Sequence, residues 1–388
     1  MRKRVICAVL AGVLLLAAGC APQGAGAARH NEQWLAGAGL DAQETPEQLY
    51  RAALDEDTLI IYSNSTRMLD VKKTFEAAYP GLVVEVTDMR GSDMLDLLIE
   101  AHGRGEPLCD LMVCADNNGA ITREMIPEGV VVKYVPWDIE DKLLPANNQE
   151  DLAFFNEGTV LYYNSEKYRE PPVSNWWELT EPRFYGKIVT SSPQKSLSMY
   201  AFFSTLIQNS EAMAESYLEH FGEPLPHPED AGWEFIDRLL KNGVVFVNSA
   251  EEIANAVGAP DLEDPALGIM ISSKVRMNDI GYALAPHYEM EPFAGALSTN
   301  SIMLVSGAEN VNAAKLFVRW LLGEADGTGE GYHPYLQMGE WPARTDIESS
   351  EPVPLAQIDL RAPDKEYLYS NRESFNQRWK ELLEAAGG

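Results

Sequence analysis

The feature that most constrains the fold of this sequence is a repeated order of short apolar strand, polar turn and amphipathic helix. The first block opens with Thr58–Ser63, a β-branched and aromatic run that is followed by a helical pattern ending near Tyr79. Two more expected strands, Leu82–Val86 and Leu108–Ala115, lie on either side of an expected helix at Ser92–His102. Strands that alternate with helices in this way predict a parallel α/β sheet.

A second block of the same kind follows a turn-rich passage after Asn164. Its expected strands are Lys187–Thr190, Val244–Val247 and Gly268–Ser272. Its expected helices run through Met199–Leu206, near Ala212–Phe221 and Gly232–Asn242, and over Ser249–Val257. Outside the two blocks, strand-like runs occur at Leu152–Asn164, Tyr282–Ala285, Gly295–Ser301 and Ile302–Val305, and the first of these divides into two pieces about Glu157-Gly158. Helical patterns occur at Val311–Leu322 and within Lys365–Ala386. Two α/β units fit a length of 388 residues, at about 100–200 residues per domain.

The first twenty residues have the pattern of a secretory signal. Three basic residues at positions 2–4 precede an apolar run over 5–18, which is too short to span a bilayer comfortably. The ending Leu16-Ala17-Ala18-Gly19-Cys20 resembles the lipobox of bacterial lipoproteins, which implies cleavage before Cys20 and lipid attachment to its thiol. We therefore predict a signal peptide at 1–19, then a lipidated Cys20 with a flexible tether over 20–46, and a protein anchored to the membrane outside the cell. The alternative is an ordinary signal peptide with a coincidental cysteine.

The charge of the chain excludes two classes of partner. The sequence carries 59 acidic and 30 basic side chains, a formal charge of −29, and loss of the signal peptide removes three of the basic ones. Such an excess of negative charge repels phosphate backbones and anionic headgroups, so no nucleic-acid partner and no polybasic membrane reader is expected. The same charge is compatible with a cationic ligand and with a merely well-solvated surface.

Cys109 and Cys114 are the cysteines that follow Cys20. They flank an Asp-Leu-Met-Val stretch on an expected strand, where residues five apart point to opposite faces, so a disulfide between them is disfavoured. No further Cys or His lies nearby at the spacing of a zinc site. We expect both to be small buried hydrophobic residues.

Several stretches, in order, resemble the extracellular solute-binding proteins of ABC importers, in the branch that includes ferric-ion, phosphorylated-sugar, phosphonate, thiamine and polyamine binders. These stretches are Leu59–Ser63, Tyr79-Pro80-Gly81, Asp110–Asp116, Gly158–Asn164, Ser174–Val189, the segment from Gly295 through Ala313–Leu321, and Gly339–Arg344. They cover roughly residues 55–347, and the run WWELTEPRFYGKI from Trp176 is the most specific of them.

The resemblance implies an α/β, two-lobed, type 2 periplasmic-binding-protein-like fold, with each lobe a mixed sheet flanked by helices and the lobes joined by hinge strands. We expect lobe one at 47–155 with 287–347, lobe two at 156–286, and a C-terminal helical segment at 348–388. Tyr162 and Tyr163 would lie on or near the hinge. Because consecutive residues of a strand face opposite ways, packing is favoured over iron ligation for this pair.

Two strand-to-helix turns are the main candidates for ligand contact. They contain Ser63, Asn64, Ser65, Thr66 and Arg67 in lobe one, and Ser191, Ser192, Lys195 and Ser196 in lobe two. Hydroxyls and free backbone N–H groups at a helix N-terminus, with a cation beside them, suit a phosphate, phosphonate or carboxylate. The alternative is that these residues only cap helices.

Further candidates are Asp116 and Asn117 after the third strand, and Ser273, Lys274 and Arg276 in the late part of lobe two. In the ferric binders that the chain resembles, this late stretch supplies two adjacent tyrosines. Residues 271–276 lack them, which argues against a ferric role. Basic side chains would instead neutralise an anion, unless they are only solvated surface cations.

Enzyme motifs are missing from the sequence. It has neither the Gly-x-Ser-x-Gly turn of a nucleophile elbow nor a His-Glu-x-x-His helix. We expect a monomer without cofactor or metal that captures a small anionic solute, phosphorylated or phosphonate-like, by hinge closure and delivers it to an ABC permease with its ATPase. The alternatives are a ferric-ion, polyamine or neutral-sugar binder of the same fold, or a surface sensor module.

Overall fold

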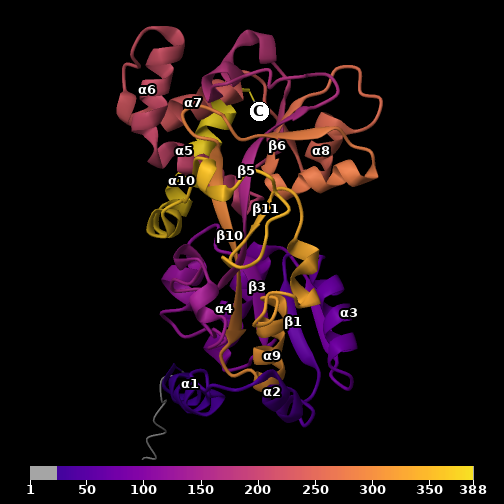
Figure 1. Cartoon of the computed structure of the whole chain (residues 1–388). Coiled ribbons are helices and arrows are strands. Elements are labelled where there is room, and N and C mark those ends of the chain that lie inside the picture. The colour runs from indigo at the N-terminus through magenta and orange to yellow at the C-terminus, as the bar shows by residue number, and fades with distance from the viewer. Residues whose placement is uncertain (1–23, 388) are drawn as a thin grey trace, which may run out of the picture.

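The computed structural model describes residues 24–387, so the expected signal peptide and Cys20 lie outside the described residues. Two α/β lobes lie one above the other and are joined by long strands (Figure 1). Twelve strands form one hydrogen-bonded sheet with the central order β2-β1-β3-β10-β5-β8-β6-β7. None of the helices in residues 24–387 combines the length and the apolar character that crossing a bilayer requires.

Lobe one is built on three parallel strands, as the sequence predicts. These are β1 (Leu59–Ser63), β2 (Val84–Asp88) and β3 (Leu111–Ala115), and the helices around them are α2 (Pro46–Ala53), α3 (Met68–Ala78), α4 (Gly91–Arg104) and α9 (Val311–Leu321). Every residue of β3 is buried, because its two faces pack into different hydrophobic clusters. The strand β4 (Val131–Val132) completes this part of the sheet.

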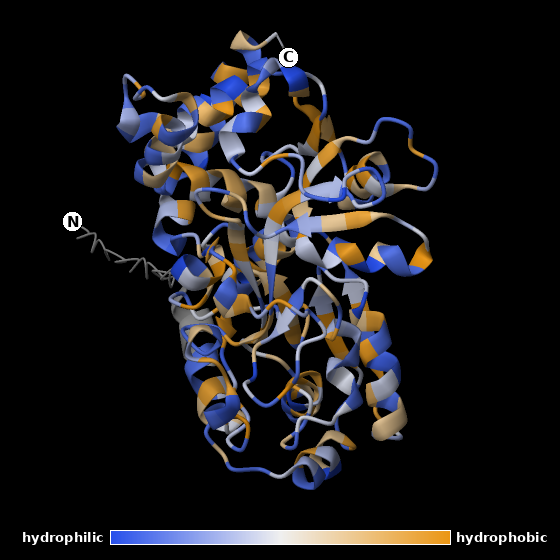
Figure 2. Cartoon of the chain, turned by 45° about the horizontal axis from the view of Figure 1, so that its top comes forward, coloured by the Kyte–Doolittle hydropathy of each residue, from blue (hydrophilic) through white to orange (hydrophobic). Residues whose placement is uncertain are grey.

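Lobe two repeats the plan. Its parallel strands are β6 (Ile188–Ser191), β7 (Val245–Val247) and β8 (Leu267–Ile271). Its helices are α5 (Leu197–Gln208), α6 (Ser210–Phe221), α7 (Ala231–Lys241) and α8 (Ala250–Gly258). A further strand, β9 (Leu284–His287), pairs with β5. Trp176 and Trp177 are fully buried here, and their indole N–H groups donate to Phe293 O and Met213 O at 2.8 Å. In both lobes the hydrophobic residues gather on the strands and on the inner sides of the helices (Figure 2).

Two long antiparallel strands run through both lobes. They are β5 (Ala153–Asn164) and β10 (Gly295–Val305), paired from Gly295 opposite Val160 to Ser301 opposite Ala153. The sequence suggested two shorter pieces in each region, but each is one continuous strand. All residues of β5 except Tyr163 are buried, so this strand lacks the alternation of apolar and polar residues by which a strand is recognised in the sequence.

The N-terminal region differs from the flexible tether expected over 20–46. It contains a helix, α1 (Gly24–Ala38), followed by α2 with a capping box at Thr45. Trp34 Nε1 donates to Ala308 O at 2.8 Å, and Asn31 Nδ2 donates to Gly129 O at 3.0 Å. These contacts hold residues 31–46 against lobe one. Because they join residues that are 98 and 274 positions apart, they could not be recognised from the local sequence.

The cysteines and the tyrosine pair lie as expected. Cys109 and Cys114 are free and buried, and burial raises the pKa of both thiols, that of Cys114 to about 12. Tyr162 is fully buried and its hydroxyl donates to Ser272 O, whereas Tyr163 is only partly buried and packs against the core of lobe two.

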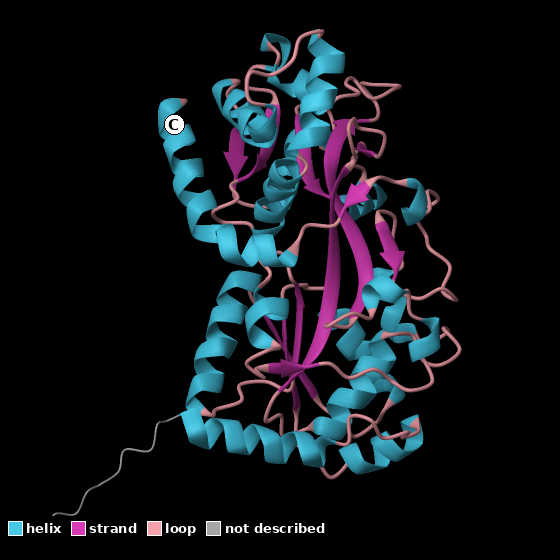
Figure 3. Ribbon diagram, turned by 90° about the vertical axis from the view of Figure 1, so that its left-hand side faces the viewer, coloured by secondary structure: helices cyan, strands magenta, loops and turns pink. Residues whose placement is uncertain are grey.

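The C-terminal helix α10 (Lys365–Ala385) touches both lobes. The end of this helix, at the C-terminus, lies along the side of the upper lobe (Figure 3). Its aromatic residues Phe375 and Trp379 pack in the core of lobe two. Its first turns reach lobe one, where Tyr369 Oη donates to Glu124 Oε2 at 3.0 Å and Lys365 Nζ donates to Asp116 O at 2.5 Å. This helix is therefore a second connection between the lobes, beside β5 and β10.

We predict that Gly119→Ala detaches the start of α10 from lobe one. Gly119 has φ +75°, and a Cβ there would lie 2.1 Å from Lys365 O. Strain of this kind costs about 1–3 kcal/mol before the clash is counted. The free energy of unfolding in urea should fall by at least that amount.

Gly103→Ala is the control, because Gly103 lies in α4 with nothing near its Cβ position. Replacing an exposed helical glycine by alanine stabilises a protein by about 0.5–1 kcal/mol. Equal stability of the two variants would contradict the bridging contact.

Candidate functional site

A cleft with a cavity volume of about 690 Å³ lies where the two lobes face each other. Its walls are the segments that follow β1, β2 and β3 in lobe one and β6, β7 and β8 in lobe two, and its floor is formed by β5 and β10. The cleft thus lies outside the carboxyl ends of the parallel strands, which is the position where open α/β sheets bind ligands.

The first Ser-rich turn forms part of the wall of lobe one. Asn64, Ser65, Thr66 and Arg67 line the cleft, whereas Ser63 is buried and its Oγ accepts from Ser65 N at 3.0 Å. No side chain caps α3. Among the described residues, the backbone N–H groups of Thr66 and Arg67 make no hydrogen bond, so this helix start keeps donors for an anion.

The second turn lies across the cleft in lobe two. Ser191, Lys195 and Ser196 line the cleft. Ser192 does not, because its carbonyl oxygen and hydroxyl accept the N–H groups of the following residues and so hold the turn together. Ser196 caps α5 by accepting from Met199 N at 3.4 Å. Ser196 therefore both caps α5 and lines the cleft.

A short helix after β8, η7 (Ser272–Ile280), brings three of the candidate residues to the cleft. Ser273 is fully buried and donates to Glu157 Oε2 at 2.9 Å. The Lys274 ammonium pairs with Glu251, and burial lowers the pKa of this lysine. Arg276 donates to Ser273 O at 2.8 Å.

The two candidates after β3 have separate roles. Asn117 lines the cleft and accepts from Ser298 Oγ at 3.1 Å. Asp116 points away from it: its carboxylate accepts from Ile121 N and Thr122 N at 3.1 Å and so caps a short helix, η1 (Ile121–Met125). A carboxylate directly after a strand can serve either purpose, and the sequence does not distinguish them.

Arg67 is neutralised within the protein. Its guanidinium donates to both oxygens of Glu340 at 2.5 and 2.6 Å and lies 4.3 Å from the centre of the Tyr335 ring. Burial lowers the pKa of Arg67, but the hydrogen bonds and charge of Glu340 outweigh it, so this pKa is raised. Burial also raises the pKa of Glu340 to about 7, although Arg67 opposes that shift.

Lys195 and Arg276 are the lining cations left for an anion. Of the five basic residues along the cleft, Arg67, Arg90 and Lys274 form salt bridges with Glu340, Asp93 and Glu251. Within residues 24–387, no acidic group lies within salt-bridge distance of the other two, Lys195 and Arg276, both in lobe two.

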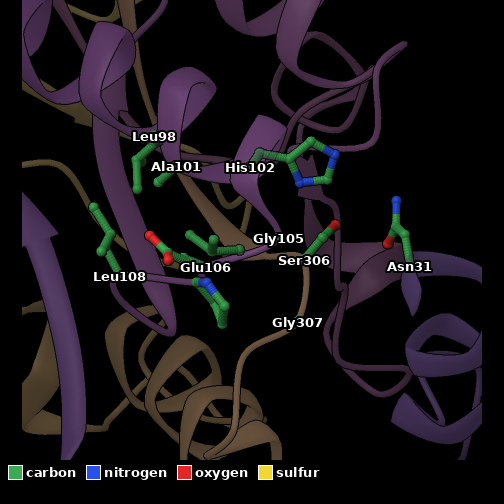
Figure 4. Close-up of a pocket in the computed structure, with 11 residues that line it drawn as sticks. Asn31, Leu98, Ala101, His102, Gly105, Glu106, Leu108, Ser306 and Gly307 are labelled. Carbon is green, nitrogen blue, oxygen red and sulfur yellow. The ribbon is translucent and has the colours of Figure 1, made fainter. Parts of the chain in front are cut away.

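A second pocket lies away from the cleft, in lobe one (Figure 4). It lies among α1, α4 and the turn at Ser306 and Gly307, and its lining is mostly apolar. Its volume of about 30 Å³ suffices for one or two water molecules but not for a solute. The cleft is therefore the candidate binding site.

The family pattern of the bacterial extracellular solute-binding proteins matches residues 61–328. The chain belongs to this family. It is thus a solute-binding protein and not an enzyme, of the class that serves as the extracytoplasmic substrate-binding component of ABC transporters.

Individual relatives are distant. The solute-binding protein is 22% identical, over 282 residues, to the "Probable ABC transporter periplasmic-binding protein y4fP" of Sinorhizobium fredii, with 70% of each chain covered. Its structure is similar to the periplasmic binding protein AfuA from Actinobacillus pleuropneumoniae with fructose-6-phosphate bound (TM-score 0.64, 19% identity, 84% of this chain and 99% of that chain). It is also similar to iron-bound HitA from Pseudomonas aeruginosa (TM-score 0.62, 15% identity, 84% and 99%). These likenesses confirm the type 2 fold.

Sequence reasoning missed two groups of lining residues of this solute-binding protein. One is the pair of helix starts after β2 and β7, with Arg90–Ser92 and Asn248–Glu251. They follow strands just as the two Ser-rich turns do, so the same signal would have found them. The other group, Phe155, Glu157 and Asn300, lies on β5 and β10. Only the register of those strands reveals which side chains face the cleft.

We predict that Arg67→Met destabilises the solute-binding protein by about 3–5 kcal/mol, because it leaves Glu340 buried without its counterion. The sign with pH follows from the raised pKa of Glu340. The folded state keeps a proton that the unfolded state releases above the ordinary value of 4.5. Without Arg67, which lowers this pKa in the wild type, the variant goes on losing stability after the wild type has stopped, so the difference in unfolding free energy between variant and wild type should be small at pH 5 and grow as the pH rises past about 7.

Two further variants check this prediction. The double variant Arg67→Met/Glu340→Gln should recover part of the loss, since no buried carboxylate remains unpaired there. Lys73→Met, which breaks the exposed pair with Asp70, should change stability little. A loss at Arg67→Met that is independent of pH would contradict the role of Glu340.

Proposed function

We propose that this solute-binding protein captures a small anionic solute, phosphorylated or phosphonate-like, and delivers it to an ABC permease with its ATPase. The observation that carries the proposal is the pair of Ser-rich turns that face the cleft from opposite lobes, with Lys195 and Arg276 beside them. Hydroxyls, unpaired backbone N–H groups and cations are the donors that bind phosphate and phosphonate oxygens.

Two observations support an anion over the other ligands of this fold. The structurally similar AfuA binds fructose-6-phosphate. The similar HitA binds iron, but no tyrosine occurs among the described residues that line the cleft here. Fe(III) prefers anionic oxygen ligands, so a cleft without tyrosine and with five basic residues suits it poorly.

Capture would follow from closure of the lobes. The candidate ligand residues are divided between lobe one, lobe two and the strands between them, so a bound solute makes its full set of contacts only when the lobes approach. A ligand that contacts both lobes shifts the equilibrium toward the closed form by its difference in affinity for the two forms. The permease would recognise that form.

We predict that sugar phosphates or phosphonates raise the melting temperature of the purified protein, whereas neutral sugars do not. For an anion that binds, Lys195→Ala and Arg276→Ala should each raise the dissociation constant about tenfold or more by calorimetry. Lys187→Ala is the matched control, since Lys187 is an exposed lobe-two cation outside the cleft, paired with Asp264. Stabilisation by Fe(III) or polyamines alone, or unchanged affinity in both cleft variants, would refute the anion.

We also propose that Cys20 is lipidated after cleavage of the signal peptide and anchors the protein to the membrane. The lipobox-like end of the signal, Leu16–Cys20, supports this. In cells fed radioactive palmitate, the wild type should be labelled and should sediment with membranes, because one thioether-linked lipid plus a second acyl chain gives stable anchoring. Cys20→Ser should be unlabelled, while Cys109→Ser, a change of a buried thiol, should label normally. An unlabelled wild type would rule out the anchor.

A further inference from the structure

Glu157 is a buried carboxylate that faces the cleft without a basic partner. Its residue is 7% exposed and lines the cleft floor. One oxygen accepts from Asn300 Nδ2 at 3.0 Å and the other from Ser273 Oγ at 2.9 Å. Within residues 24–387, no Lys, Arg or His nitrogen lies within 4.0 Å of this carboxylate. Neutral hydrogen bonds thus solvate the charge but do not cancel it.

A second carboxylate makes the local excess of negative charge larger. The strand β11 (Glu340–Pro342) pairs with β5 so that Glu340 lies directly opposite Glu157. Like charges opposite each other on paired strands are destabilising. Two cations interact with the Glu157 charge from beyond salt-bridge distance, Arg67 and Lys274. Each already has its own carboxylate partner, Glu340 for Arg67 and Glu251 for Lys274.

The cleft wall of lobe two has the opposite imbalance, an excess of positive charge. Lys195 and Arg276 on lobe two have no acidic partner among the described residues. Among the described residues that line the cleft, two carboxylates also form no salt bridge, Asp88 of lobe one and Glu157 of β5. Asp88 is exposed to solvent, whereas Glu157 is buried. A purely anionic solute would neutralise the two cations and leave the Glu157 carboxylate buried without a counter-charge when the lobes close. A buried charge without a counter-charge is costly.

We infer that the solute is zwitterionic: besides its anionic group it bears a protonated amine or a similar cation that contacts the Glu157 carboxylate. This inference rests on the proposed function, which gives the solute an anionic group, and adds a positively charged group to the same solute. A sugar hydroxyl can also donate to Glu157, but it leaves the negative charge uncompensated. An ammonium group both donates and neutralises.

Matched pairs of solutes that differ only in the amine test this directly. We would titrate the protein by calorimetry with glucosamine 6-phosphate against glucose 6-phosphate, and with 2-aminoethylphosphonate against ethylphosphonate. In at least one pair, the member with the amine should bind ten times or more tightly than its partner. This comparison uses the wild type, so it does not depend on the folding of a variant.

Glu157→Gln locates the effect at the proposed group. A glutamine keeps the shape of the side chain, and its amide can accept from Asn300 and donate to Ser273, so the hydrogen bonds of the carboxylate can persist. The variant should lose the preference for the amine and bind the amine-free member at least as well as the wild type does. Glu100→Gln, an exposed acid on α4 paired with Arg104, is the matched control and should keep the preference.

The outcomes separate the two proposals. Tight binding of an amine-free anion with no gain from the amine would overturn the inference at Glu157 and leave the anionic solute intact. A preference that survives in Glu157→Gln would overturn it as well. Binding of no phosphate or phosphonate in either pair, with or without an amine, would overturn both proposals together.

Discussion

The antiparallel ladder of β5 and β10 is the interaction on which the rest of the structure depends. The two strands pass through both lobes, and their register fixes which side chains reach the cleft floor. Phe155 and Glu157, two residues apart on β5, share the face that lines the cleft. Asn300 on β10 pairs with Phe155, so it is a diagonal neighbour of Glu157 on the same face. The amide of Asn300 can therefore reach the Glu157 carboxylate.

The proposed closure of the lobes would have to act through this ladder and through α10. Each lobe has its own hydrophobic clusters, so a change in the angle between lobes need not disturb either core. However, α10 is fixed in lobe two by Phe375 and Trp379, and its start touches Asp116 and Gly119 of lobe one. Asn117, between these two, lines the cleft. A solute that displaces this loop would thus also act on the contact between α10 and lobe one.

The parts of the fold and site that follow from local sequence were predictable. The order of strands and helices and the two Ser-rich turns depend on neighbouring residues, and eleven of the fourteen candidate residues line the cleft. Ser63, Ser192 and Asp116 face elsewhere because their side chains satisfy nearby backbone groups. The pairing of Arg67 with Glu340, 273 positions away, could not be predicted, since it depends on how β11 docks on β5. Small residues near Gly24–Arg29 suggested a tether, but packing of Trp34 on lobe one outweighs that composition.

Whole-chain charge and cleft charge act over different distances, which explains how a protein with a formal charge of −29 can suit an anionic group. Between exposed charges, salt screens interactions beyond about 10 Å, so most of the acidic surface contributes little inside the cleft. What a bound solute experiences is the set of groups in contact with it, and most of these are already paired, as Arg67 is with Glu340 and Lys274 with Glu251. Selectivity must then come from the few lining charges without a salt bridge among the described residues, which include Lys195, Arg276 and the buried Glu157. These three include both signs of charge, which favours a solute that carries both and not one that is merely negative.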